Sequence, residues 1–193
     1  MRVIAGRARG TRLAGLKGTG VRPTLDRVRE SLFSILGHDL SGECFLDWFG
    51  GSGAVGIEAL SRGAEKVVWI ENNRQAQQLI YANLEKCRFW NGEDESKASN
   101  WVLLKMDALQ AISVMEERSF LFDIVYLDPP FADGLYEHCL AALAKSQLLN
   151  ASSLVVVEHH HKNVLQEFYG KLSRTDQRRV GDNCLSFYGI KNS

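Results

Sequence analysis

The sequence lacks the features of a membrane-spanning, secreted or disulfide-stapled protein. No apolar run approaches the roughly 18 residues that a transmembrane helix needs, and the first residues lack the apolar stretch of a signal peptide. The four cysteines are scattered without a C-x-x-C pair, which indicates neither a disulfide framework nor a zinc site. We therefore expect a cytoplasmic protein with no membrane partner and no bound metal.

The sequence also lacks a net charge, because 23 basic residues balance 23 acidic residues. The charges are nevertheless separated, since residues 1–30 hold eight basic against two acidic side chains. An arginine-rich arm without an amphipathic apolar face favours nucleic acid over a membrane, and the alternative is a solvated basic face. The candidate contacts are Arg2, Arg7, Arg9, Arg12, Arg22, Arg27 and Arg29.

The apolar residues alternate between strand-like and helix-like patterns along the chain. Five short apolar runs are typical of buried parallel strands: 44–46, 66–70, 101–105, 122–127 and 154–157. Two final runs flank a turn at 181–183, which predicts a closing antiparallel hairpin. The sequence therefore predicts a doubly wound, Rossmann-like α/β sheet that is mostly parallel and has an antiparallel C-terminal edge hairpin.

We expect a basic N-terminal extension at residues 1–21 and a main domain at residues 22–193. Small or apolar residues alternate with basic ones around Gly6, which predicts a short β-hairpin that carries arginines outward and stays outside the core.

Local patterns give four further expectations. A helix that begins near Thr24 should bury Val28, Leu32, Ile35 and Leu36 and leave its arginines exposed. A short helix is expected over residues 163–169. Residues 90–100 are polar and rich in turn formers, which is typical of a surface insertion. The three histidines at 159–161 are expected in a loop.

A glycine-rich segment follows the first expected strand. Residues 51–56, GSGAVG, match the pattern G-x-G-x-x-G, and Glu71 lies 20 residues after Gly51, where a ribose-binding acid belongs. The match alone is compatible with a nicotinamide dinucleotide or with another adenosine cofactor. Asp47 at the end of the first strand disfavours a pyrophosphate because like charges repel, whereas a carboxylate accepts hydrogen bonds from an ammonium or a hydroxyl.

A second motif, Asp128-Pro129-Pro130-Phe131, follows the fourth expected strand. Hydride transfer has no obvious use for it, so it disfavours an oxidoreductase. The structural alternative is an ordinary turn at the end of a strand.

The two motifs together resemble the class I S-adenosylmethionine-dependent methyltransferases that act on exocyclic amines. The segment FLDWFGGSGAVGIEALSRGA, Glu71, the Asp107-Ala108 pair and DPPF occur in that order. The lead-in RVIAG…RPTLDRVRESLFSIL narrows the resemblance to the bacterial 16S ribosomal RNA guanine-N2 methyltransferases of the RsmD type. The resemblance spans nearly the whole chain. It implies methylation of one guanine N2 amine in 16S rRNA, within the small ribosomal subunit or an assembly intermediate, by a monomeric enzyme.

The resemblance also implies where the cofactor S-adenosylmethionine binds. The glycine-rich segment would approach the methionine part, Glu71 would accept the ribose hydroxyls, and Asp107 with Ala108 would address the adenine amine. The expected cofactor-binding residues are Asp47, Phe49, Gly50, Gly51, Ser52, Gly53, Glu71, Asn72, Asp107 and Ala108. The structural alternative for Glu71 and Asp107 is that each is a solvent-exposed carboxylate at a strand end or a carboxylate that caps a helix.

The DPPF motif is the expected catalytic element. Asp128 and a carbonyl of the rigid Pro129-Pro130 turn would each accept one N–H of the guanine amine and aim its nitrogen for direct in-line transfer. Phe131 would stack on the flipped base, unless it is a core aromatic. Thr24 and Arg27 would contact RNA or the cofactor carboxylate. The alternatives are a DNA or protein amine methyltransferase and a non-catalytic RNA-binding factor.

Overall fold

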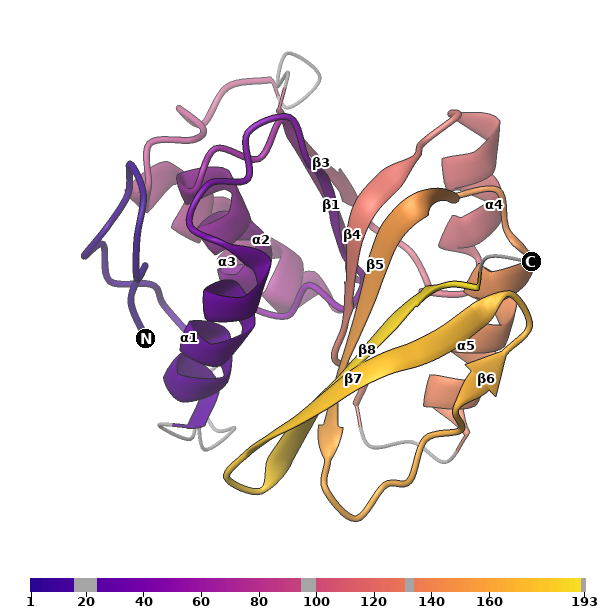
Figure 1. The fold of residues 1–193 in the computed structure, drawn as a ribbon. Helices are drawn as coiled ribbons and strands as arrows, with labels where there is room; N and C mark the ends of the chain where they lie inside the picture. The colour runs from indigo at the N-terminus through magenta and orange to yellow at the C-terminus, as the bar shows by residue number, and fades with distance from the viewer. Residues whose placement is uncertain (16–23, 95–99, 131–133, 192–193) are drawn as a thin grey trace.

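The computed structural model describes residues 1–15, 24–94, 100–130 and 134–191, and it has the α/β architecture predicted from the sequence (Figure 1). The described residues form an eight-stranded sheet with the order β3-β2-β1-β4-β5-β8-β7-β6. The strands from β3 to β5 are parallel to their neighbours, and β8, β7 and β6 are antiparallel. This confirms the predicted doubly wound sheet with its antiparallel C-terminal edge.

The helices and strands follow the expected alternation. The helices are α1 (Thr24–Leu36), α2 (Ala54–Ser61), α3 (Arg74–Lys86), α4 (Ala111–Glu117) and α5 (Leu135–Lys145). The strands are β1 (Cys44–Asp47), β2 (Lys66–Ile70), β3 (Trp101–Leu104), β4 (Phe122–Leu127), β5 (Leu149–His160), β6 (Phe168–Tyr169), β7 (Leu172–Val180) and β8 (Asn183–Ile190). In the described part of the chain, no helix has the length and apolar character needed to cross a membrane.

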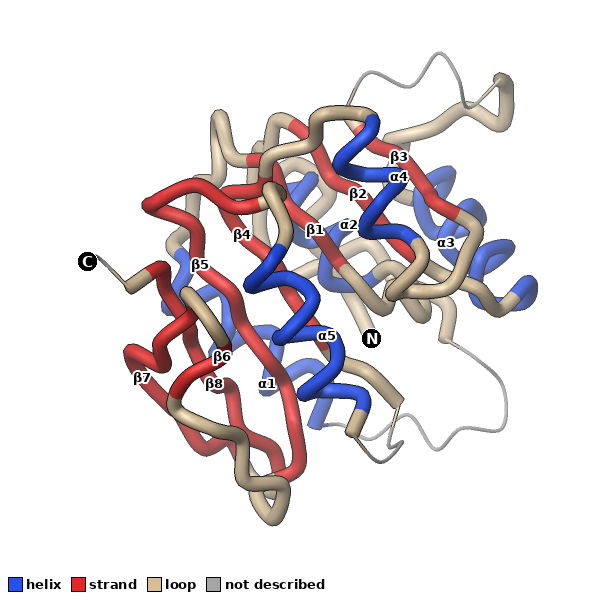
Figure 2. Tube along the Cα trace, turned by 90° about the vertical axis from the view of Figure 1, so that its right-hand side faces the viewer, coloured by secondary structure: helices blue, strands red, loops and turns tan. Residues whose placement is uncertain are grey.

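Helices cover both faces of the sheet (Figures 1 and 2). Helices α1, α2 and α3 pack on one face through a cluster that includes Leu32 and Phe45, while α4 and α5 pack on the other through a cluster that includes Leu46 and Leu140. Phe45 and Leu46 belong to different clusters because successive strand residues point to opposite faces. The strand order reverses direction at β1, so the fold places a ligand crevice at the carboxyl ends of β1 and β4.

The N-terminal segment (residues 1–15) packs into the core. Its two halves meet at a single β-bridge between Arg2 and Arg12 instead of forming regular strands. Val3, Ala8 and Leu13 are buried in the same cluster as α1, α2 and α3. The prediction that this segment stays outside the core is therefore wrong, since its apolar residues point inward while its arginines point outward. The boundary between residues 21 and 22 lies outside the described residues and stays a prediction.

Three buried side chains hold the N-terminal segment against α2 and α3. The Glu58 carboxylate accepts hydrogen bonds from the N–H groups of Ile4 (2.7 Å) and Ala5 (2.9 Å). Ser61 Oγ accepts one from the Ala8 N–H (3.0 Å), and Asn83 Oδ1 accepts one from the N–H of Ala14 (2.8 Å). The segment is therefore fixed by side chains of the main domain as well as by apolar contacts.

The chain after β4 differs from the sequence prediction in two places. Strand β5 runs from Leu149 to His160, so it is longer than expected and includes two of the three histidines that were assigned to a loop. Residues 163–169 do not form the predicted short helix, and the last two form β6 against β7. The segment buries Leu165 and Tyr169, while Val164 and Phe168 are exposed.

Only part of the expected 90–100 insertion is described. Trp90 is half-buried and packs against Tyr81, with ring centroids 4.9 Å apart. Residues 91–94 are exposed, as expected of a surface insertion, whereas residues 95–99 lie outside the described part.

Candidate active site

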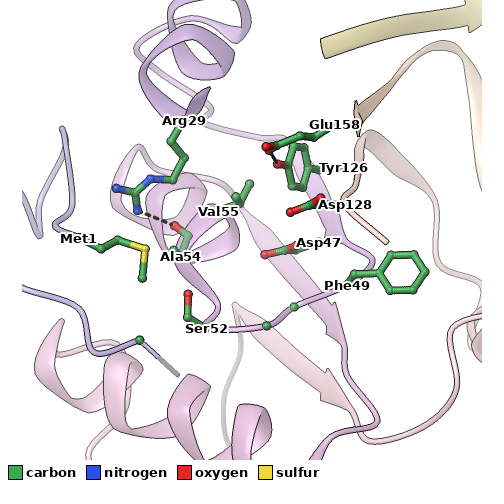
Figure 3. A pocket seen from close by; sticks show the side chains of 13 residues that line it. Met1, Arg29, Asp47, Phe49, Ser52, Ala54, Val55, Tyr126, Asp128 and Glu158 are labelled. Atoms are coloured by element: carbon green, nitrogen blue, oxygen red, sulfur yellow. Dashed lines mark hydrogen bonds between the residues drawn. The ribbon is translucent and has the colours of Figure 1, made fainter. Parts of the chain in front are cut away.

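A cavity of about 200 Å³ lies at the carboxyl ends of β1, β4 and β5 (Figure 3). Asp47 ends β1, Asp128 follows β4, and Glu158 lies on β5, and all three line the cavity. The structure therefore brings the two sequence motifs together in one pocket. The predicted site residues in its lining are Asp47, Phe49, Gly50, Gly51, Ser52 and Asp128.

The glycine-rich segment makes a tight turn between β1 and α2. Gly51 and Gly53 have φ angles of 52° and 76°, which lie in the left-handed region that favours glycine. The Gly53 N–H donates to the Gly50 carbonyl at 2.6 Å and closes the turn. Phe49 borders the cavity, but its ring points away from the other labelled side chains (Figure 3). The turn therefore presents mainly backbone and the small Ser52 side chain to a ligand.

Asp47 is buried beneath this turn. It is 1% exposed, and its Oδ2 accepts a hydrogen bond from the Gly56 N–H at 3.0 Å. Burial raises the pKa of Asp47 to about 8 because a charge is costly in a poorly solvated site. A positive charge bound in the cavity would favour the ionised carboxylate.

The raised pKa of Asp47 predicts a pH dependence of stability without ligand. The pKa is about 8 in the folded protein and near 4 in the unfolded chain, so the folded state binds more protons between these values. The free energy of unfolding should therefore fall as pH rises from about 4 to about 8, by on the order of a few kcal/mol. We expect Asp47→Asn to reduce this fall, measured by urea denaturation at pH 5 and pH 8. An equal fall in both proteins would contradict the prediction.

Asp128 stands beside a hydrogen-bonded pair formed by Tyr126 and Glu158. The Tyr126 hydroxyl donates to Glu158 Oε2, and Asn183 Nδ2 donates to Glu158 Oε1 at 2.6 Å. Desolvation raises the pKa of Asp128 well above its usual value, and the Glu158 and Asp47 carboxylates raise it further. The Asp128 residue is exposed where it borders the cavity, so water moderates the desolvation. The pocket thus brings three acidic side chains close together, and a bound cation would favour their ionised forms.

Glu71 contacts the turn without lining the cavity. Its carboxylate accepts hydrogen bonds from the N–H groups of Gly51 (2.8 Å) and Asn73 (2.7 Å). Asn72, between Glu71 and Asn73 in the sequence, is exposed. Glu71 therefore lies beside the turn, as a ribose-binding acid should, and its contact with a ribose stays a prediction.

The Asp107-Ala108 pair forms a turn before α4, which begins at Ala111. Asp107 is exposed, and its Oδ1 accepts hydrogen bonds from the N–H groups of Leu109 (2.9 Å) and Gln110 (3.3 Å). The Ala108 carbonyl accepts one from Trp48 Nε1 at 2.8 Å. The pair lies outside the cavity lining, so contacts with an adenine stay a prediction.

The motif expected to be catalytic is described up to Pro130. Pro129 is buried and Pro130 is exposed next to Asp128. Phe131 lies outside the described residues, so stacking on a base stays a prediction.

The arginines of the N-terminal segment lie on the surface. Arg2, Arg7, Arg9 and Arg12 are exposed, and the Arg7 guanidinium lies 4.4 Å from the centre of the Phe89 ring. Arg27 on α1 is also exposed. Arg22 lies outside the described residues, and α1 begins at Thr24 as expected.

Arg29 is buried, so the prediction that it contacts nucleic acid is wrong. It is 3% exposed, and its NH2 group donates to the Arg2 carbonyl (2.6 Å) and to Asp26 (2.8 Å). The buried face of α1 includes Arg29 and Phe33, whereas Ile35 is 45% exposed. The helix is rotated relative to the predicted apolar stripe because Arg29 joins α1 to the N-terminal segment.

Sequence reasoning missed several residues that line the cavity, namely Met1, Gly15, Ala54, Val55, Tyr126 and Glu158, and it assigned the lining residue Arg29 to RNA. A signal for Glu158 was present, because it follows an apolar strand run as Asp47, Glu71 and Asp128 do. Met1 and Gly15 carry no such signal. They reach the cavity only because the N-terminal segment folds back onto α2 and α3.

Comparisons with known proteins give consistent matches. The model of the family described as "Conserved hypothetical protein 95" matches residues 1–189. The protein named "Ribosomal RNA small subunit methyltransferase D" from Escherichia coli K12 is 36% identical over 188 residues, with 97% of this chain and 89% of the relative covered. The protein of that name from Haemophilus influenzae is 35% identical over 159 residues, covering 82% and 78%.

A solved structure from Escherichia coli, named "Putative methyltransferase yhhF", is similar along the whole chain. It has a TM-score of 0.80 at 29% sequence identity, with 100% of this chain and 99% of that chain covered. A structure described as "SMU.776, a putative methyltransferase complexed with SAH" has a TM-score of 0.66 at 15% identity, with 89% of this chain and 50% of that chain covered. The second likeness concerns the fold alone.

Proposed function

Because the chain belongs to the Conserved hypothetical protein 95 family, together with relatives named ribosomal RNA small subunit methyltransferase D, we propose that it methylates the N2 amine of a guanine in 16S rRNA. The family predicted from the sequence is thereby confirmed, as is a methyltransferase that uses S-adenosylmethionine. The guanine and its N2 amine are our proposal. The main observation that supports this proposal is that Asp47 and Asp128 line the same cavity.

The residues of the cavity suit the cofactor. Three carboxylates line it, from Asp47, Asp128 and Glu158, and they favour a cationic ligand over a pyrophosphate. Asp47 would hold the cofactor's ammonium, Glu71 its ribose hydroxyls, and Asp107 with Ala108 its adenine amine. When bound, S-adenosylmethionine supplies an electrophilic methyl group on a sulfonium.

Asp128 and the Pro129-Pro130 turn would orient the target amine. The lone pair of a guanine N2 amine is delocalised into the ring, which makes the nitrogen a poor nucleophile. Asp128 and a carbonyl of the turn each accept one N–H, which concentrates electron density on the nitrogen and fixes its direction. After transfer the nitrogen is cationic and acidic, and Asp128 would accept its proton. Phe131 would stack on the flipped base.

Arginines on the surface would hold the RNA backbone. Arg2, Arg7, Arg9 and Arg12 lie together on the N-terminal segment, and Arg27 is exposed on the neighbouring α1. Arginine binds phosphate oxygens through a planar fork of donors. We expect these contacts to supply affinity, and the cavity to select the base.

Mass mapping of methylated nucleosides tests the proposal. The purified protein is incubated with S-adenosylmethionine and either naked 16S rRNA or the small subunit, and the rRNA is then digested and mapped. We expect one N2-methylguanine at one position. Transfer to DNA or to a protein instead would favour the alternative amine methyltransferases. RNA binding with no transfer to any substrate would indicate a non-catalytic binding factor.

A further inference from the structure

The C-terminal part of the chain carries a second concentration of positive charge. Residues 160–193 hold six basic and three acidic side chains, whereas residues 31–159 hold nine basic and 18 acidic ones. The chain is therefore basic at both ends and acidic in the middle. The proposed function has a use only for the first basic end.

Three exposed basic residues of this part lie around the turn between β7 and β8. Arg178 and Arg179 are at the end of β7, and Lys162 is in the turn after β5. The His161 N–H donates to the Asp182 carbonyl at 2.8 Å and joins the two turns. We call these two joined turns, residues 161–163 and 178–183, the hairpin tip.

The hairpin tip is joined to a residue of the active-site cavity. His160, the last residue of β5, pairs with Asn183, the first residue of β8. Asn183 donates a hydrogen bond to the cavity residue Glu158. Because β8 runs antiparallel to β5, the tip lies at the same edge of the sheet as Asp47 and Asp128.

Helix α1 lies between the hairpin tip's strands and the N-terminal segment. It contacts β7 and β8 on one side, and Arg29 joins it to Arg2 on the other. Figure 1 shows the β7–β8 hairpin reaching toward α1. Arg2 of the N-terminal segment, Arg27 on α1 and the hairpin tip therefore follow one another on this side of the molecule, whereas Arg7 lies at the far ends of α2 and α3, beside Ser61 and Phe89.

The charges of the tip differ in how far they are neutralised. Arg178 Nε donates to Asp176 at 2.8 Å, so part of its charge is balanced. Arg179 Nε donates to the neutral Gly181 carbonyl at 2.9 Å, and within the described residues Arg179 forms no ion pair. Arg179 and Lys162 are therefore the side chains best suited to a phosphate.

We propose that the hairpin tip is a second RNA-binding surface, in which Arg179 and Lys162 contact phosphates on the side of the cavity opposite the N-terminal segment. This inference rests on the proposed RNA substrate. An RNA held at two places keeps the nucleotide between them over the cavity, which favours entry of a flipped base.

Charge reversal at the hairpin tip tests this surface. We expect Lys162→Glu/Arg179→Glu to weaken binding of a 16S rRNA transcript by roughly 10-fold and to lower the salt dependence of binding by about 1 to 2 ions. Affinity for S-adenosylhomocysteine should not change, because neither side chain lines the cavity. Filter binding at several salt concentrations and calorimetry give these values.

A matched control distinguishes an effect of the hairpin tip from an effect of the protein's net charge. Arg118 and Lys145 are exposed and lie at the ends of α4 and α5, shortly before β4 and β5 begin, so they are at the opposite edge of the sheet. Arg118→Glu/Lys145→Glu makes the same charge change and should bind RNA like wild type. Equal weakening in both variants, or none in the hairpin variant, would overturn the proposal, provided that thermal unfolding shows both variants folded.

The same measurements distinguish this proposal from the proposed function. If the wild-type protein binds the transcript but transfers no methyl group, the proposed function is rejected. The comparison of RNA binding between the hairpin variant and the control variant then still tests the hairpin surface. If wild type transfers the methyl group and the hairpin variant binds RNA normally, only the hairpin surface is rejected. If wild type does not bind RNA, both are rejected.

Discussion

Asp128→Ala is expected to lower the rate of methyl transfer by about 10²- to 10⁴-fold, since an oriented acceptor for the reacting amine contributes effects of that size. Asp128 borders the cavity just after β4, the strand that pairs with β1 and its terminal residue Asp47. In the described residues, no second Asp-Pro-Pro turn could replace it. Single-turnover assays with 16S rRNA measure the rate, and calorimetry with S-adenosylhomocysteine measures cofactor affinity.

The second measurement decides the role of Asp128. Cofactor affinity should stay within a few-fold of wild type, because the expected cofactor contacts lie on Asp47, Glu71 and the glycine-rich turn. Asp128→Asn is the matched control: it keeps an acceptor oxygen and removes the charge, so its rate should lie between those of wild type and Asp128→Ala. Loss of cofactor binding together with activity would instead assign Asp128 to the cofactor or to folding.

Glu58→Ala is expected to reduce the free energy of unfolding by about 3 to 5 kcal/mol, the range for removing one partner of a buried ion pair. The Glu58 carboxylate is fully buried and binds Arg62 Nε at 2.9 Å in addition to the N–H groups of Ile4 and Ala5. Without it, the largely buried Arg62 charge and two backbone donors lose their partner. Urea denaturation measures the change.

A surface variant and a conservative variant give the controls for Glu58. Glu65 is exposed, and Glu65→Ala should change stability by less than about 0.5 kcal/mol. Glu58→Gln keeps one carbonyl oxygen for an N–H and should be less destabilising than alanine. A loss below about 1 kcal/mol in Glu58→Ala would show that the N-terminal segment is held mainly by its apolar residues.

The sheet and the turn could be predicted from the sequence because their signals are local. Strands β1 to β4 are short apolar runs, and each is followed by an acid or a glycine within a few residues. Helix α2 lies between Gly53 and Gly63, which are also local signals in the sequence. Asp47 and Asp128 could be placed in one site because parallel strands end at the same edge of the sheet.

The N-terminal segment and Arg29 could not be predicted because their environments depend on distant partners. An arginine is usually exposed, and only the folded segment shows that Arg29 has the Arg2 carbonyl as an acceptor. The segment's own pattern of basic and apolar residues does not reveal Glu58, Ser61 and Asn83. The pairing of Tyr126 with Glu158 was hidden for the same reason, since it joins β4 to β5 through side chains.

The anchors of the N-terminal segment also bear on the order in which the protein folds. Ile4 and Ala5 find their acceptor 54 and 53 residues later, and Ala14 finds Asn83 69 residues later. Contacts of such separation form slowly because a long loop must first be closed. During synthesis, residues 4–14 must therefore wait for all of these partners until α3 has been made. Met1 and Gly15 line the cavity, so its wall is complete only when the N-terminal segment is anchored on α2 and α3.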